Sequence, residues 1–276
     1  MPSLIGRALD GLQRLAARSS VLVRLAVLIR NQARCVIKYH LAESPDVAFT
    51  GEVWLRERIA PSAMFIVDVG ANVGEWLDGM RALKGPELFS ALAFEPSASA
   101  AARLRARFAG DERVRITEAA VGDESGTLSF FEEDDAGKGS SLVPDFMRSA
   151  GTTRSVSVTT LDAAVTSAGW ERIDFLKIDA EGYDLRVLRG AASLLAHRQI
   201  AVLQFEYNRP WQLAGETLRG AYLLLESHGY EVYLLKRDGL YRLNYLLYEE
   251  YFEYSNFVAV APDSASMLAD RIRGTI

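Results

Sequence analysis

The sequence predicts an α/β fold, in which a mostly parallel sheet carries helices on both faces and ends in antiparallel strands at one edge. From residue 65 onward, short apolar runs alternate with stretches whose apolar residues recur at three- and four-residue spacing. This alternation is typical of parallel strands joined by helices that cover both faces of the sheet. Late in the chain, strand-like runs follow one another closely, and this succession favours antiparallel pairing at the sheet edge.

The expected elements can be placed by residue number. Strands are expected at 64–70, 90–96, 114–121, 173–182 and 200–208, followed by late strands at 230–237, 240–246 and 256–262. Helices are expected near 74–84, 97–109, 183–197 and 215–228. The polar, glycine-containing segment 132–155 has no clear periodicity, and we expect so long a loop inside a compact domain to be a functional lid.

Composition limits the number of domains and the kinds of site. With 276 residues, 49% of them hydrophobic, and a mean hydropathy of +0.03, the chain can bury the core of one large α/β domain plus an extension. We expect the extension at residues 1–45 and the domain at 46–276. The single cysteine, Cys35, excludes an internal disulfide and any multi-cysteine metal site, and it fits a reducing, cytoplasmic location.

The first forty residues differ in charge from the rest. They contain seven Arg or Lys and one acidic residue, whereas the whole chain has a formal charge of -5. The main domain is therefore acidic, which argues against nucleic acid as its partner. The apolar run "VLVRLAVLI" is interrupted by Arg24 and is too short to cross a bilayer.

Residues 1–40 predict a basic amphipathic helix, because Arg7, Arg14 and Arg18 recur at near-helical spacing among leucines. Such a helix binds the cytoplasmic face of a membrane, packs on a partner subunit as in a homodimer, or covers the main domain. The sequence leaves these three alternatives open.

The stretch "FIVDVGANVGEW" at 65–76 predicts a ligand-binding turn. A strand ending at Asp68, followed by Gly70, Asn72 and Gly74 and then by a helix, is typical of the first turn of a nucleotide-binding sheet. The stretch is not G-x-G-x-x-G, because Asn72 places a side chain where pyrophosphate rests in dinucleotide enzymes. S-adenosylmethionine carries no phosphate and fits better, since its ammonium group can meet Asp68 while the glycines pass under its ribose.

Two further strand ends support this ligand. Glu95 lies 21 residues after Gly74, a separation at which an acid accepts hydrogen bonds from the two ribose hydroxyls, and Pro96 ends that strand. Asp123 follows the third strand and can approach the adenine amino group, although Gly-Asp is also an ordinary turn pair. The predicted cofactor-binding residues are Asp68, Gly70, Asn72, Gly74, Glu95, Pro96, Asp123 and Asp179.

The motifs "DVGANVG", "AFEP", "AAVGD", "TTLD" and above all "LKIDAEGYDLRVLRGA" at 176–191 resemble the FkbM-type S-adenosylmethionine-dependent methyltransferases. The resemblance runs from about Val67 to Ala261 and does not cover residues 1–45. It implies a Rossmann-like class I methyltransferase sheet and methyl transfer to a hydroxyl of a sugar, glycolipid or polyketide-type acceptor. Asp184 departs from the family pattern, which usually has glutamate at this position.

The chemistry is expected at the carboxyl edge of the sheet. Methyl transfer to a hydroxyl needs an in-line acceptor oxygen and a base that removes its proton. Asp179 is the preferred base, with orientation of the cofactor or helix capping as its alternative role. Glu206 and, if the N-terminal segment folds over the site, His40 are the other catalytic candidates. Magnesium held by Asp179, Glu206 and Asn208 would lower the pKa of the acceptor hydroxyl, but no spacing requires a metal and none is expected.

The acceptor side is expected to combine flat apolar side chains with polar groups. The candidate acceptor-binding residues are Trp76, Ser140, Ser141, Glu181, Tyr207, Asn208 and Trp211. Aromatic residues at helical positions also commonly belong to the core. Two other functions stay open, namely a nicotinamide-dependent oxidoreductase, against which Asn72 argues, and a non-catalytic adapter with a vestigial cofactor fold.

Overall fold

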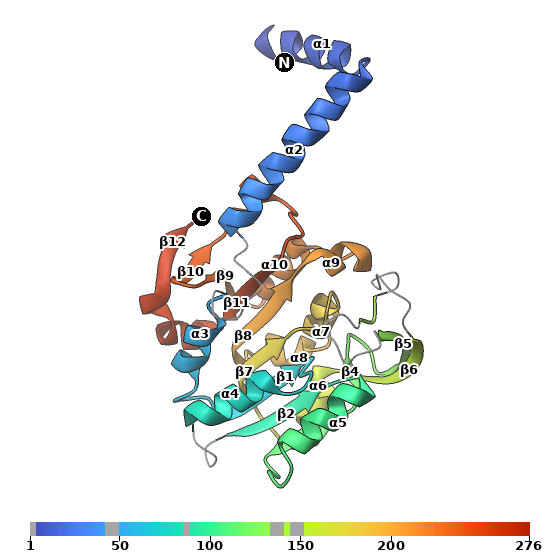
Figure 1. The fold of residues 1–276 in the computed structure, drawn as a ribbon. Helices are drawn as coiled ribbons and strands as arrows, with labels where there is room; N and C mark the ends of the chain where they lie inside the picture. The colour runs from blue at the N-terminus through green and yellow to red at the C-terminus, as the bar shows by residue number, and fades with distance from the viewer. Residues whose placement is uncertain (1–3, 42–49, 85–88, 133–140, 144–151) are drawn as a thin grey trace. The chain divides into compact units, whose positions relative to one another are not determined.

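The computed structural model describes residues 4–41, 50–84, 89–132, 141–143 and 152–276 (Figure 1). The chain divides into two compact units, Met1–Glu43 (unit 1) and Ser44–Ile276 (unit 2). In unit 1, the described residues form α1 (Leu4–Ala16) and α2 (Ser20–Leu41). No helix in the described ranges is both long and apolar enough to span a bilayer.

Unit 2 is built on a nine-stranded sheet with the order β12-β10-β9-β11-β8-β7-β1-β2-β3. The strands from β8 to β3 run parallel, whereas β11 runs antiparallel to its neighbours β8 and β9. The predicted fold class, a mostly parallel sheet with antiparallel strands at one edge, is therefore confirmed. The strands of this sheet are β1 (Phe65–Val69), β2 (Ser90–Phe94), β3 (Val114–Thr117), β7 (Ile173–Ile178), β8 (Ile200–Tyr207), β9 (Glu231–Lys236), β10 (Gly239–Arg242), β11 (Ser255–Val260) and β12 (Ile272–Thr275).

Helices cover both faces of the sheet (Figure 1). Ile66, Phe175 and Val202 lie on one face and are fully buried in the core cluster that also holds side chains of α3, α4 and α5. The intervening residues Val67 and Leu176 are fully buried as well, so the second face is also covered. The helices are α3 (Glu52–Ile59), α4 (Glu75–Lys84), α5 (Ala98–Arg107), α6 (Leu161–Ala168), α7 (Asp184–Arg189), α8 (Ala192–Ala196), α9 (Arg209–Ala214), α10 (Leu218–Ser227) and α11 (Tyr245–Tyr248), with the 3-10 helices η2 (Pro262–Met267) and η3 (Ala269–Arg271).

The strand order reverses direction between β1 and β7. From β1 the chain adds β2 and then β3 on one side, whereas β7 and β8 are added on the other. In open parallel sheets, ligands bind at the carboxyl edge where the order reverses. We therefore expect the site at the carboxyl ends of β1, β2, β7 and β8.

A second, three-stranded sheet with the order β4-β6-β5 was not predicted. It consists of β4 (Ala120–Val121), β5 (Gly126–Glu132) and β6 (Thr152–Thr159). The predicted strand at 114–121 is wrong as one element, because β3 belongs to the large sheet and β4 to the small one. Segments 133–140 and 144–151 of the expected lid lie outside the described residues. Its end is not a loop, since residues 152–155 belong to β6, which buries Val156 and Val158 and exposes the serines beside them.

The predicted helix at 183–197 is two helices, α7 and α8. They are separated at Gly190, where an added Cβ would lie 2.0 Å from the carbonyl oxygen of Gly122. This close approach of two backbones requires glycine and ends the first helix. The expected strand at 240–246 stops at Arg242, before α11, and α3, α6, α9 and β12 were not predicted.

Candidate active site

Acidic side chains gather where the strand order reverses. Asp68 is the second-last residue of β1, and Glu95 directly follows β2. Asp179 and Glu181 follow β7, and Glu206 is the second-last residue of β8. Because β8, β7, β1 and β2 are consecutive parallel strands, these five carboxylates lie along one edge of the sheet.

The turn after β1 is fixed by the backbone around it. Gly70 has φ +77°, and an added Cβ would lie 1.9 Å from the carbonyl oxygen of Asp179. The Gly70 N–H donates to the carbonyl oxygen of Phe94 at 2.9 Å. Asn72 has φ +48°, and Gly74 has φ +82° with an added Cβ 2.4 Å from a side-chain carbon of α5. The glycines are therefore needed for contacts within the protein, which hold the turn between β2 and β7.

Glu95 is held by backbone N–H groups from two elements. Its Oε2 accepts from Asn72 at 2.8 Å and its Oε1 accepts from Ser97 at 2.8 Å. Burial raises the pKa of Glu95 to about 7, against the effect of these two hydrogen bonds. A carboxylate oxygen can accept more than one hydrogen bond, so both oxygens keep the capacity to bind hydroxyl groups.

Lys177, which sequence analysis missed, joins two of the acids. The strand register places it beside Asp68, and its Nζ lies 3.9 Å from Asp68 Oδ1 and 3.0 Å from Asp179 Oδ2. Burial acts to lower the pKa of Lys177, but the charges of Asp179, Asp68 and Glu52 outweigh it and hold the pKa above its ordinary value. Lys177 is therefore a buried cation. The signal was a lysine inside the apolar run "FLKID".

Asp68 lies beside Lys177 and has no exposed surface. Neither of its carboxylate oxygens has a hydrogen-bond partner among the described residues. Burial raises the pKa of Asp68 to about 6, an effect that Lys177 partly offsets. A buried acceptor without a donor costs roughly 1–3 kcal/mol, so this position favours a ligand that brings N–H or O–H groups.

Two more acids complete the edge. The Asn208 side-chain amide donates to Glu206 Oε1 and, at 3.5 Å, to Glu181 Oε2. Burial raises the pKa of both glutamates, and the charge of Asp179 raises them further. Asp184 has no exposed surface and accepts the Gly182 N–H at 3.2 Å, so it organises the turn between β7 and α7.

A chain of buried amides continues from this edge toward β11, and the sequence did not predict it. The Gln204 side-chain amide donates to Glu52 Oε1 and, at 3.1 Å, to Asn256 Oδ1. Asn256 in turn donates to the Tyr254 hydroxyl at 3.2 Å. Within the described part of the chain, Gln204 Oε1 and Asn208 Oδ1 are buried and have no hydrogen-bond partner. Gln204 and Asn208 can therefore each accept a further hydrogen bond through a side-chain oxygen.

Tyr207 and Trp211 were expected to contact an acceptor, and the structure corrects this. Both have 0% exposed surface, and their rings lie 5.4 Å apart edge to face. The Trp211 Nε1 donates to the carbonyl oxygen of Glu206 at 2.9 Å, and the Tyr207 hydroxyl donates to Glu250 at 2.9 Å. These aromatic rings belong to the core, where they support the end of β8.

Other predicted acceptor residues have structural contacts. Trp76 stacks on Phe175 with ring centroids 5.3 Å apart. The Ser141 hydroxyl donates to the carbonyl oxygen of Glu181 at 2.7 Å. Residues 141–143 of the expected loop are thus tied to the acidic edge, whereas Ser140 lies outside the described residues. Whether Trp76 and Ser141 also contact an acceptor stays a prediction.

The remaining predicted residues are more distributed. Asp123 lies 3.9 Å from Arg186 at the end of a weak ion pair, and the Pro96 carbonyl oxygen accepts from Arg154. His40 lies on α2 in unit 1, and its catalytic role stays a prediction. Among the described residues, no group of three or more His, Cys, Asp or Glu side chains is arranged to hold a metal ion.

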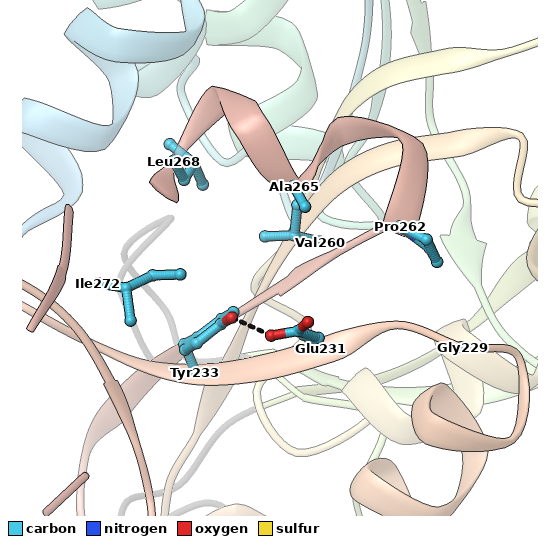
Figure 2. Close-up of a pocket in the computed structure, with 8 residues that line it drawn as sticks. All are labelled: Gly229, Glu231, Tyr233, Val260, Pro262, Ala265, Leu268 and Ile272. Atoms are coloured by element: carbon cyan, nitrogen blue, oxygen red, sulfur yellow. Dashed lines mark hydrogen bonds between the residues drawn. The ribbon is translucent and has the colours of Figure 1, made fainter. Parts of the chain in front are cut away.

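A separate cavity has a volume of about 50 Å³, and Figure 2 draws the residues that line it. It lies where β9 begins and β11 ends, which is the opposite edge of the sheet from the acidic residues. Its lining is largely apolar, and the Tyr233 hydroxyl donates to Glu231 beside it. This cavity is therefore not part of the candidate site. It is lined by Gly229, Glu231, Tyr233, Val260, Pro262, Ala265, Leu268 and Ile272.

The chain is similar to known methyltransferases. Residues 68–232 match the family model of the methyltransferase FkbM domain. No curated protein matches the chain. Among solved structures, the chain is similar to the methyltransferase FkbM from Methylobacillus flagellatus KT, with 16% identity and a TM-score of 0.44 over 71% of this chain and 43% of that chain. It thus spans less than half the length of that protein.

Two more solved structures are similar to this chain. One is a precorrin-6y C5,15-methyltransferase from Geobacter metallireducens GS-15, with 11% identity and a TM-score of 0.41 over 76% of this chain and 87% of that chain. The other is the fibrillarin of Aeropyrum pernix with bound S-adenosyl-L-methionine, with 12% identity and a TM-score of 0.40 over 83% of this chain and 74% of that chain.

Proposed function

We propose that this chain, which belongs to the FkbM methyltransferase family, transfers a methyl group from S-adenosylmethionine to a hydroxyl of a sugar, glycolipid or polyketide-type acceptor. The observation that carries the proposal is the placement of Asp68, Glu95 and Asp179 around one rigid turn, at the point where the strand order reverses. The family match extends over all three residues.

The residues on the cofactor side fit S-adenosylmethionine by the hydrogen bonds they can still make. Glu95 has an oriented carboxylate that can accept from both ribose hydroxyls. Asp68 has two buried oxygens without a donor among the described residues, and the ammonium of the cofactor carries N–H donors. When bound, S-adenosylmethionine supplies the electrophilic methyl group from its sulfonium.

The acceptor side supports a ligand with several hydroxyl groups. Gln204 Oε1 and Asn208 Oδ1 are buried acceptors that lack a partner in the described structure. Each side-chain nitrogen is already engaged, with Glu52 and Glu206 respectively, which fixes the orientation of each amide. A polyhydroxylated acceptor supplies the missing O–H donors, whereas a purely apolar acceptor would leave these oxygens unsatisfied.

Asp179 is the proposed base. Its side chain is 36% exposed, which is more than that of the buried acids Asp68 and Glu206 beside it. Lys177 holds Oδ2 at 3.0 Å and so leaves Oδ1 to accept the proton of an acceptor hydroxyl. The same lysine keeps the carboxylate oriented while the proton moves.

The variant Asp179→Asn tests this role, because it keeps the shape of the side chain but cannot take a proton. Removing a general base should lower kcat by roughly a hundred- to ten-thousandfold and leave cofactor affinity nearly unchanged. The assay uses labelled S-adenosylmethionine with fractionated sugars and lipids. Asp263→Asn makes the same chemical change on the exposed surface and should behave as the wild type.

A different pattern would assign Asp179 another role. A carboxylate that only orients the cofactor would raise the KM for S-adenosylmethionine with a smaller loss of kcat. Near-normal kcat in Asp179→Asn would rule it out as the base, and Glu206→Gln would then be measured in the same assay.

A further inference from the structure

Unit 1 carries two exposed amphipathic helices whose partner is not explained by methyl transfer. Most of the exposed large apolar side chains in the described part of the chain lie on α1 and α2. On α1, Leu9, Leu12 and Leu15 are 52%, 64% and 64% exposed. Such a concentration of apolar side chains in water marks an interaction surface rather than ordinary surface composition.

On α1 the apolar and charged side chains occupy opposite sides. Leu9, Leu12 and Leu15 share one side at three-residue spacing. Arg7 and Arg14 share the other side at seven-residue spacing, and Asp10 between them bonds to Arg14 at 3.0 Å. This helix can therefore bury one face while its charges stay in water or meet a charged surface.

The longer helix α2 separates the two kinds of side chain less completely, because the exposed Val23, Val27 and Ile37 lie among its basic residues. Arg24, Asn31 and Lys38 recur every seven residues on one side, with Arg30 and Arg34 adjacent to them. The opposite side carries exposed apolar side chains, and these are Val21, Leu22, Leu25, Leu28, Ile29, Val36 and Tyr39. The helix is too short in its apolar part to cross a bilayer but is suited to lie along one.

Charge favours an anionic partner for these helices. Residues 1–40 hold seven Arg or Lys and one acidic residue. A second copy of the same helices would bring two sets of like charges together, which is unfavourable. A bilayer with anionic headgroups offers both an apolar layer for the leucines and negative charge for the arginines.

We propose that α1 and α2 form an interfacial anchor, which lays unit 1 on the surface of an anionic lipid bilayer. The apolar sides of the two helices enter the headgroup boundary, and the arginines and Lys38 contact the headgroups. The anchor does not depend on the proposed methyl transfer, since it uses no residue of the acidic edge. It would bring the chain to a surface where lipid-linked molecules are found.

Co-sedimentation of the full chain with vesicles tests the anchor. Vesicles of phosphatidylcholine alone are compared with vesicles that also contain phosphatidylglycerol. The wild type should bind the anionic vesicles at least roughly tenfold more tightly, and high salt should remove much of the difference. Equal recovery with both vesicle types would overturn the proposal.

Paired variants separate the two contributions. Arg24→Gln with Arg34→Gln should lower affinity for anionic vesicles by roughly tenfold or more, since each cation near an anionic surface contributes about fivefold. Leu12→Gln with Leu15→Gln should lower affinity for both vesicle types. Glutamine has a helix propensity similar to that of both leucine and arginine, so the helices should persist by circular dichroism.

Matched controls make the same chemical changes on unit 2. Arg103→Gln with Arg115→Gln, and Leu246→Gln with Leu247→Gln, replace exposed side chains outside α1 and α2 and should leave vesicle binding unchanged. Sedimentation equilibrium without lipid tests the competing partner. A dimer that dissociates in the helix variants, together with no vesicle binding, would assign the surface to a second copy and overturn the proposal. If the variants in α1 and α2 instead lower the melting temperature of unit 2 and leave vesicle binding unchanged, the helices pack on unit 2 and the proposal is also overturned.

Discussion

Asp68→Asn should stabilise unit 2 at neutral and alkaline pH while weakening the binding of S-adenosylmethionine. Asp68 has no exposed surface, and neither carboxylate oxygen has a hydrogen-bond partner in the described residues. Asparagine has nearly the same shape and no charge. The substitution therefore removes the cost of burying a carboxylate without breaking a hydrogen bond.

The size of the effect follows from the pKa of Asp68. Burial raises it from 3.8 to about 6 in the folded state. Below pH 3.8, the Asp68 carboxyl is protonated in both the folded and the unfolded state, so the wild type and Asp68→Asn should be equally stable. As pH rises, the unfolded carboxyl ionises first, so wild-type stability falls until pH exceeds about 6. A difference of about two pKa units corresponds to about 3 kcal/mol, so the advantage of Asp68→Asn should approach that value near pH 8.

Urea unfolding followed by tryptophan fluorescence measures this difference. All four tryptophans lie in unit 2, so the signal reports that unit alone. Unfolding free energies are compared at about pH 5 and about pH 8, with Asp263→Asn as a surface control expected to change stability by no more than about 0.5 kcal/mol. Titration calorimetry at the same pH gives the cofactor affinity. If Asp68→Asn is less stable than the wild type at pH 8, the carboxylate is stabilised by its surroundings and the reasoning is refuted.

Three more predictions concern the cofactor site and one close backbone contact. Glu95→Ala removes a charged acceptor and should weaken S-adenosylmethionine binding roughly ten- to a hundredfold in calorimetry. Glu95→Gln can still accept one backbone N–H and should weaken binding with less effect on the fold. Unchanged affinity in both variants would contradict the assignment of Glu95 to the cofactor site. NAD and NADP should bind no more tightly than millimolar, roughly −4 kcal/mol, because the Asn72 side chain is expected where pyrophosphate would rest. Micromolar NAD binding would favour the oxidoreductase alternative. Gly190→Ala should destabilise unit 2 by roughly 1–3 kcal/mol, because its Cβ would meet the Gly122 carbonyl oxygen, whereas Gly126→Ala has nothing within 4 Å and should change the melting temperature little.

The features that sequence predicted are local in the chain. The turn at 70–74 and the acids at Glu95 and Asp179 follow apolar runs directly, so their position at strand ends can be inferred from neighbouring residues alone. The strand register then decides what these acids meet. Lys177 was missed because its partner Asp68 is more than a hundred residues away and becomes its neighbour only when β1 pairs with β7.

Burial was the other property that sequence left undetermined. Tyr207 follows Glu206 at the end of a strand and Trp211 lies four residues later, a position that suits both ligand contact and core packing. Tyr207 contacts Phe257 on β11 and bonds to Glu250, both far along the chain, and Trp211 packs against Tyr207. By contrast, β6 begins at Thr152, inside the segment 132–155 that was expected to be a loop, and the alternation of Val156 and Val158 with serines directly after this segment was a visible strand signal.

The most direct test of the central claim is the fate of the methyl group. S-adenosylmethionine with a carbon-13 methyl is incubated with the full chain and fractionated sugars, glycolipids and polyketides, and the products are examined by NMR. The account predicts a labelled methyl ether with the wild type, and its near absence with Asp179→Asn, which should still bind the cofactor in calorimetry. A label found on nitrogen or carbon would contradict transfer to a hydroxyl, and failure of the wild type to bind S-adenosylmethionine would contradict the proposed function as a whole.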